Sequence, residues 1–85
     1  MMYEIEWSKK SLTQLENLPN DIQERIINAL DRTKIRPEQY FTRLVGDPRF
    51  KLKVGKYRVI ARIEHEVLKI LVVEVGHRKN IYKGL

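Results

Sequence analysis

The sequence lacks cysteine, and none of its apolar runs is long, within a chain of 85 residues. Without cysteine the chain forms no disulfide bond and offers no thiolate to a metal ion. Two histidines, His65 and His77, stand apart without a cluster of carboxylates, so we expect no metal and no cofactor. The short apolar runs predict no membrane-spanning helix, and the polar start predicts no signal peptide. These absences fit a cytoplasmic protein.

Hydrophobic residues make up 42% of the chain, enough for one modest core, so we expect residues 1–85 to form a single domain. The formal net charge is +6, and its placement is uneven. Residues 1–40 hold six Lys and Arg against seven Asp and Glu, whereas residues 41–85 hold eleven against four. This asymmetry is typical of a chain with a polyanionic partner, although a solvated surface accounts for it equally well on charge alone.

The first half of the chain predicts one strand followed by two helices. Residues 3–7 alternate with period two, which places the apolar Tyr3, Ile5 and Trp7 on one face. Ser8 is a candidate N-cap for a first helix with leucines at helical spacing, and Pro19 stops that helix. The apolar positions of that helix are Leu12, Leu15 and Leu18.

The second predicted helix has Asn20 as its candidate N-cap, with Gln23 at capping-box distance. Pro37 ends this helix, because the residue before a proline avoids the helical region. Its apolar stripe consists of Ile22, Ile26, Ala29, Leu30 and Thr33. The two helices form a hairpin with one apolar face, and this face requires a sheet to cover.

The second half of the chain supplies that sheet. We expect a short strand at Leu44-Val45, a turn at Gly46-Asp47-Pro48, and strands at 50–54, 57–63 and 67–75. Gly55-Lys56 is a two-residue turn with glycine first. The predicted order is β-α-α-β-β-β-β, an α+β fold with a helical hairpin packed on a mostly antiparallel sheet.

The predicted hairpin around Gly55-Lys56 gathers positive charge on one face. Its turn pairs Lys53 with Arg58, Lys51 with Ile60, and Arg49 with Arg62, and directly paired residues share a face. That face therefore carries five cations and Ile60, and we expect no carboxylate within it. Like charges opposed across strands cost up to ~1 kcal/mol per pair, which an anion bound there would offset. The pattern favours a phosphate-binding surface.

The segment after the last strand adds further candidates. Gly76 allows the backbone to turn, so that Arg78, Lys79 and Tyr82 fold over the edge of the basic face. An aromatic residue such as Tyr82 is as readily an anchor for the C-terminal tail. His65 lies in a predicted turn, and we expect it to be solvated.

With these residues in place, the sequence resembles the RelE toxins of the RelE/ParE toxin–antitoxin superfamily along nearly its whole length. The matching motifs, in order, are Trp7-Ser8-Lys9, Leu44-Val45-Gly46, Phe50-Lys51-Leu52-Lys53, Gly55-Lys56-Tyr57-Arg58-Val59 and Val75-Gly76-His77-Arg78-Lys79-Asn80-Ile81-Tyr82. Each motif alone is weak, and their order and spacing together are fairly specific.

The resemblance implies a toxin that enters the ribosomal A site and cuts mRNA there, neutralised by a RelB-like antitoxin. The catalytic residues that it implies are Lys51, Lys53, Arg58, Arg78 and Tyr82. Further RNA contacts are expected from Arg43, Arg49, Lys56, Arg62 and Lys79. Some members of the family have a second arginine soon after the first, where this chain has Lys79 and Asn80. The spacing between this arginine and the C-terminal tyrosine also varies among members.

The implied chemistry is cleavage of RNA through its own 2′-hydroxyl, which needs a proton acceptor, a proton donor and stabilisation of a charged phosphorane. One of Lys51 and Lys53 is the expected general base, since neighbouring positive charge favours neutral lysine. Arg58 and Arg78 are expected to hold the scissile phosphate in bidentate geometry. Tyr82 would stack on a base or protonate the leaving oxygen.

Two alternatives remain open from the sequence. The ParE branch of the same superfamily shares the fold but blocks DNA gyrase, which requires no phosphate-cleaving cluster. A non-catalytic basic RNA-binding or ribosome-binding protein is the other alternative. The basic hairpin face argues against the first, and the mapping of mRNA ends after incubation with programmed ribosomes separates the second.

Overall fold

The structure is a computed structural model that describes the backbone of residues 1–83 and the side chains of residues 1–81. Its elements are β1 (Glu4–Trp7), α1 (Lys9–Glu16), α2 (Asn20–Arg32), the 3-10 helix η1 (Pro37–Gln39), β2 (Thr42–Arg43), β3 (Phe50–Val54), β4 (Tyr57–Glu64), β5 (Lys69–His77) and α3 (Arg78–Lys83). The predicted α+β class is confirmed. The short helix α3 after the last strand was not predicted.

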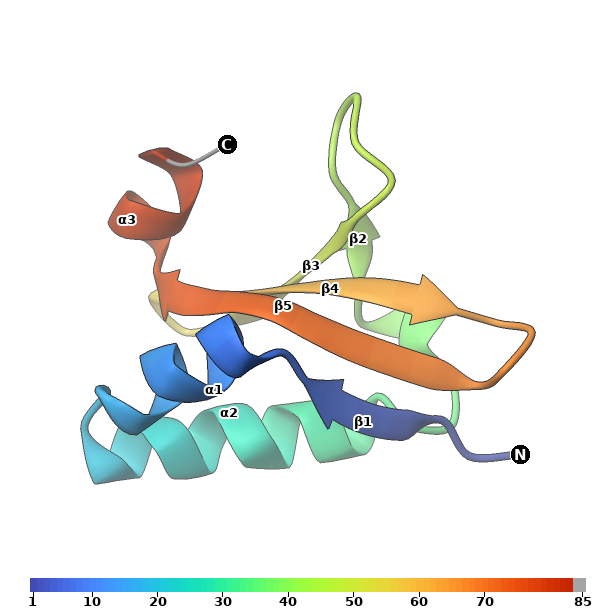
Figure 1. Cartoon of the computed structure of the whole chain (residues 1–85), viewed down its shortest axis with the longest axis horizontal. Helices are drawn as coiled ribbons and strands as arrows, with labels where there is room; N and C mark the ends of the chain where they lie inside the picture. The colour runs from blue at the N-terminus through green and yellow to red at the C-terminus, as the bar shows by residue number, and fades with distance from the viewer. Residues whose placement is uncertain (84–85) are drawn as a thin grey trace.

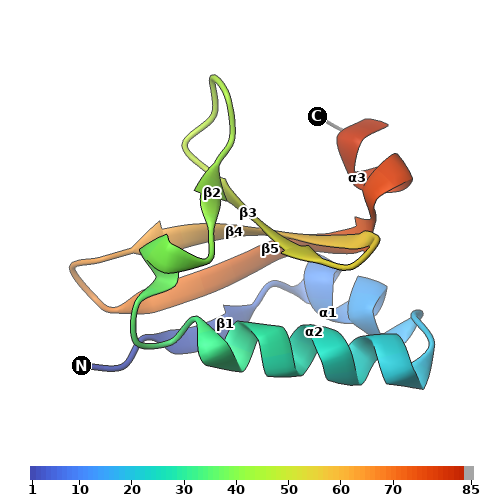
Figure 2. The same cartoon turned by 180° about the vertical axis from the view of Figure 1, so that it is seen from behind.

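The five strands form one sheet in the order β1-β5-β4-β3-β2, in which β1 runs parallel to β5 and the other neighbours are antiparallel. Helices α1 and α2 cover one side of this sheet (Figure 1). On the other side, α3 and the β2–β3 loop project away from the sheet, separated from each other, as both views show (Figure 2). We call this second side the open face. It carries Lys51, Lys53, Arg58, Ile60, Arg62, Glu64, Lys69, Leu71, Glu74 and Gly76.

The main core lies between the sheet and the two long helices. Helix α2 contributes Ile26 and Leu30, both almost completely buried, and α1 contributes Leu15. The strands contribute the remaining buried apolar side chains, which are Leu52, Val54, Val59, Ala61, Ile70, Val72 and Val75. The predicted stripes of the first strand and of both helices face this core, except that Leu12 of α1 is 44% exposed and lies outside it. Burial of each large aliphatic side chain is worth about 1.5–3 kcal/mol, so the two stripes hold the helices to the sheet.

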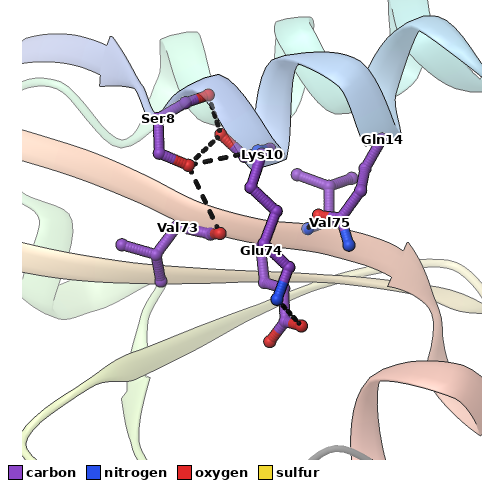
Figure 3. A network of polar contacts seen from close by, with 7 residues as sticks. Ser8, Lys10, Gln14, Val73, Glu74 and Val75 are labelled. Atoms are coloured by element: carbon purple, nitrogen blue, oxygen red, sulfur yellow. Dashed lines mark hydrogen bonds and ion pairs between the residues drawn. The ribbon is translucent and has the colours of Figure 1, made fainter.

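Helix α1 also protects the edge of β5 beyond the end of β1. The backbone N–H of Val75 donates to Oε1 of Gln14 at 2.9 Å, and the Ser8 hydroxyl donates to the carbonyl of Val73 at 3.4 Å (Figure 3). Ser8 is the N-cap of α1, as predicted, because its Oγ accepts the N–H of Ser11. Side chains of the helix thus replace a neighbouring strand along this part of β5.

The predicted cap of the second helix is wrong. Helix α2 already begins at Asn20, and Pro19 stands at the N-cap position with φ −55° and no side-chain cap hydrogen bond. Gln23 does not close a capping box, because its Nε2 donates to the carbonyl of Leu18 at 2.8 Å. Proline suits this position, since its fixed φ is compatible with the start of a helix and its missing N–H costs nothing there.

Two predicted boundaries also differ from the structure. Helix α2 ends at Arg32 rather than at Pro37. The residues that follow pair with the N-terminal segment instead of extending the helix, because the carbonyl of Lys34 accepts the N–H of Tyr3 at 2.7 Å. The strand predicted at 44–45 forms instead at Thr42–Arg43. Residues 44–49 make a loop closed by the hydrogen bond from Leu44 N–H to the Arg49 carbonyl. Among the described residues no helix is long and apolar enough to cross a membrane.

Candidate nucleic-acid interface

The β3–β4 hairpin has the register that the sequence predicts around its Gly55-Lys56 turn. Lys53 pairs with Arg58 and Lys51 pairs with Ile60, so all four side chains share the open face. The third predicted pair is not part of the ladder, because β3 begins at Phe50, one residue after Arg49. The hairpin thus brings Lys51, Lys53 and Arg58 together.

Ile60 forms an apolar floor in the middle of these cations. Its side chain is fully buried, yet it lies outside the main core, on the opposite face of the sheet. A charged group above an apolar floor is less solvated than one on an ordinary surface, which strengthens its attraction for an anion.

Arg58 is held more tightly than a surface arginine. It is only 8% exposed, and its Nη1 donates to the carbonyls of Gly55 at 2.9 Å and Tyr57 at 2.8 Å. Gly55 has φ +59°, a conformation that suits glycine and turns its carbonyl in the tight loop. The guanidinium is therefore fixed by the turn that follows β3, and a fixed donor loses little entropy on binding an anion.

The expectation that no carboxylate lies within the basic block is wrong, and Asp47 of the β2–β3 loop is the first exception. Its carboxylate accepts from Nε and Nη2 of Arg49, with a shortest distance of 2.6 Å, and from the Arg49 backbone N–H at 2.9 Å. The side-chain hydrogen bond from Arg49 is the main cause that lowers the pKa of Asp47 to about 2, and Arg62 contributes through its charge. The same pair raises the pKa of Arg49. Asp47 thus neutralises part of the charge at this end of the face.

Glu74 is the second carboxylate, and a bulge in β5 places it on the open face. Ile60 pairs with Glu74 and Ala61 pairs with Val72, so Val73 has no partner across the ladder. Strict alternation would put Glu74 on the same side as the buried Val72. The bulge turns it to the other side, where its Oε1 accepts from Lys10 Nζ at 2.9 Å (Figure 3).

Helix α3 lies against the end of the open face through Gly76 and Ile81. The predicted role of Gly76 as a turn residue is wrong, because β5 continues to His77. A Cβ on Gly76 would lie 3.3 Å from Cδ1 of Ile81, so glycine leaves the space into which this buried side chain packs. The first residue of α3, Arg78, is exposed beside the face, and its N–H donates to the Lys56 carbonyl at 2.9 Å.

Some of the remaining predicted site residues lie near the open face, and others do not. Lys56 and Lys79 are exposed near Arg78, at the β3–β4 turn and in α3. Arg43 does not join them: it pairs with Phe50, whose side chain packs on the helix side, and its guanidinium lies 5.9 Å from that ring. The backbone of Tyr82 belongs to α3, but its side chain lies outside the described residues.

The two histidines are engaged away from the open face. The Tyr3 hydroxyl lies 2.6 Å from Nδ1 of His65, which is exposed in the β4–β5 turn. His77 shares a face with Tyr57 on the helix side, where the two rings meet edge to face with centroids 5.5 Å apart. Across the described part of the chain, no group of His, Asp and Glu side chains is arranged to hold a metal ion.

Comparisons with known proteins agree with this fold. The sequence model of one family, described as "ParE toxin of type II toxin-antitoxin system, parDE", matches residues 5–82. Among curated proteins none matches the chain. Among solved structures, the RelBE2 toxin–antitoxin complex from Mycobacterium tuberculosis is similar with a TM-score of 0.82 and 22% identity, over 92% of this chain and 100% of that one.

Two further structures show the same likeness. The intact RelBE complex from E. coli has a TM-score of 0.77 and 22% identity, over 88% of this chain and 95% of that one. The archaeal RelE-RelB complex from Pyrococcus horikoshii has a TM-score of 0.74 and 22% identity, over 92% and 97% of the two chains. At these identities the likeness establishes a shared fold.

Proposed function

The chain belongs to the RelE/ParE superfamily of toxins from type II toxin–antitoxin systems, and we propose that it is an endoribonuclease that cleaves mRNA in the A site of the ribosome. The observation that carries this proposal is the open face. Lys51, Lys53 and Arg58 converge there above the buried Ile60, and Arg78 stands at the end of the same face. A gyrase inhibitor has no need of such a cluster, whereas a phosphate-cleaving site does.

In the proposed reaction the 2′-oxygen of the mRNA attacks the neighbouring phosphorus atom. Arg58 and Arg78 hold the equatorial oxygens of the phosphorane, because a guanidinium presents two parallel donors to one phosphate. Lys51 and Lys53 add positive charge and take part in proton transfer. Tyr82 stacks on a base or protonates the leaving oxygen. The ribosome positions the substrate, so free RNA is cut slowly.

The proposed partner that neutralises the toxin is a RelB-like antitoxin. The similar structures from M. tuberculosis, E. coli and P. horikoshii are complexes of a toxin with its antitoxin. The cationic open face is complementary to an acidic segment, and the outer edges of β1 and β2 are available to an added strand. A short acidic reading frame directly beside this one is the expected genomic context.

Cleavage of mRNA on programmed ribosomes tests the proposal. We expect Arg78→Ala and Arg58→Ala each to lower the cleavage rate by ~10²–10³, the usual cost of removing one donor to a charged transition state. Arg32→Ala is the matched control, because this exposed arginine lies in the last turn of α2, on the helix side. Thermal unfolding of each variant is measured in parallel. Full cleavage by both variants would refute the assignment.

The ParE description of the matching family favours a second candidate, inhibition of DNA gyrase. The two functions differ in their first cellular effect: an endoribonuclease halts translation, whereas a gyrase inhibitor induces DNA damage signals without new mRNA ends. A supercoiling assay with purified gyrase gives the same separation in vitro. Ribosome binding without new ends within codons would instead indicate a non-catalytic RNA-binding protein.

A further inference from the structure

Glu74 lies on the open face with the cations of the proposed site, and we propose that it accepts the proton of the attacking 2′-hydroxyl. This inference rests on the proposed ribonuclease function and assigns one step of it. The expectation from sequence gave this step to a lysine. The structure adds a group of the opposite charge to the same face.

Glu74, Ile60 and Lys51 lie side by side in one cross-strand row. Lys51 of β3 pairs with Ile60 of β4, which pairs with Glu74 of β5. Two steps between neighbouring strands separate the backbones of Lys51 and Glu74 by about 10 Å. Both side chains are long enough to lean over the buried Ile60 from opposite sides. A phosphate bound over this row would lie between an ammonium group and a carboxylate.

The position of Glu74 depends on the bulge at Val73. If residues 72–75 alternated regularly, without the bulge, Glu74 would project into the core beside Val72, and Val75 would project outward. Bulges recur next to active sites, where they turn a particular side chain to a new direction. The bulge keeps both Val72 and Val75 in the core and presents Glu74 on the open face.

One carboxylate oxygen of Glu74 is held by an ion pair, and the other is positioned to accept a proton. Its Oε1 accepts from Lys10 Nζ at 2.9 Å, and the side chain of Glu74 is 17% exposed against 65% for Lys10. Among the described residues, Oε2 of Glu74 makes no hydrogen bond. Lys10 reaches from α1 past β5 to the carboxylate of Glu74 (Figure 3).

A site with lysine as its general base requires a neutral lysine at neutral pH, whereas a carboxylate is already able to accept a proton. Glutamate side chains in peptides lose their proton near pH 4.3 and lysines near pH 10.4, so at neutral pH glutamate is the ready acceptor and lysine the ready donor. In the assigned step, the 2′-oxygen forms a bond to phosphorus and its proton passes to Oε2 of Glu74. The bond from phosphorus to the 5′-oxygen breaks, and Lys51 gives that oxygen a proton. The products are a 2′,3′-cyclic phosphate and a 5′-hydroxyl, and solvent restores both side chains.

Glu74→Gln in the full-length toxin tests this assignment, because it keeps the shape and removes the acceptor. We expect single-turnover cleavage on programmed ribosomes to fall by ~10²–10⁴, with ribosome binding unchanged. The acid limb that a carboxylate base gives to the pH–rate profile should disappear in the variant. Lys10→Met is the matched control, since it breaks the same ion pair. It should lower the rate less than about fivefold, as expected for an exposed pair.

The outcomes are distinguishable. A wild-type toxin that cuts no mRNA on ribosomes would overturn the proposed function itself. A wild-type toxin that cuts, together with a Glu74→Gln variant of equal rate, would overturn only the role of Glu74. An equal loss in both variants would also overturn it, because the ion pair would then act only as a tether between α1 and β5.

Discussion

The docking of α3 on the open face can be tested through Ile81. This side chain is 3% exposed and packs against Gly76, and α3 has only six residues. A helix of this length has no stability of its own in water, so contacts with the sheet must hold it. We expect Ile81→Ala to release α3 while the rest of the domain remains folded, since Ile81 lies outside the main core.

The magnitude follows from the burial of one aliphatic side chain. Replacing a buried isoleucine by alanine costs about 2–5 kcal/mol. A loss of ~2 kcal/mol changes the ratio of docked to undocked helix by about 30-fold. Because Arg78 is the first residue of α3, its guanidinium would lose its place beside the face. Cleavage should therefore fall nearly as far as in Arg78→Ala.

Amide hydrogen exchange measures this directly, because local opening of α3 exposes its amides without global unfolding. In Ile81→Ala, protection should be lost at the amides of Arg78 and Lys79, which donate to the Lys56 carbonyl and to Nδ1 of His77, and kept in β4 and β5. Val67→Ala is the matched control, since it truncates an exposed aliphatic side chain in the β4–β5 turn. Retained protection of α3 in Ile81→Ala would refute the reasoning. So would loss of protection throughout the sheet.

Two further predictions concern stability. Asp47→Asn removes a carboxylate whose pKa is lowered from 3.8 to about 2 in the folded protein. The wild type should therefore be more stable than the variant by a constant amount above pH 4, and this difference in the free energy of unfolding should vanish as the pH falls to about 2. Urea unfolding of both proteins from pH 2 to 6 measures the difference, and a difference that does not change with pH would contradict the prediction. Ser11→Ala should lower the free energy of unfolding by ~1–2 kcal/mol, because the buried Ser11 hydroxyl donates to the carbonyl of Val72 at 2.9 Å. Urea unfolding at neutral pH measures this loss, and an unchanged midpoint would show that the hydrogen bond contributes nothing to stability.

The sequence was informative where local patterns decide the structure. The Gly55-Lys56 turn fixes the pairing of β3 with β4, and alternation then sorts Lys51 and Lys53 from the apolar residues between them. The Ser8 cap is likewise a matter of a few neighbouring residues. In both cases a single turn or a single side chain is enough to predict the local structure.

The sequence was less informative where distant residues decide the structure. The run from Val67 to Val75 is apolar except for Lys69 and Glu74, and nothing within it indicates that a bulge at Val73 turns Glu74 to the open face. Glu74 was missed for that reason. The one available signal was the presence of a single acidic residue deep in an otherwise apolar strand. Asp47 was missed because its partner Arg49 was assigned to the ladder.

The docking of α3 could not be predicted either. The sequence of the six residues after β5 does not predict a helix, because so short a helix is stable only when Gly76 leaves room for Ile81 to pack. This contact joins residues that are close in sequence, but it depends on the sheet beneath them. Tertiary packing here overrides what the local sequence indicates.

The parallel pairing of β1 with β5 has a consequence for the order in which the nascent chain acquires its structure. Strand β1 is synthesised first, yet its neighbour in the sheet is β5, which also borders β4. Contacts between segments so distant in sequence form late, after the chain between them has been made. A growing polypeptide that lacks β5 therefore lacks the partner of its own first strand, and it also lacks Glu74 and the attachment point of α3.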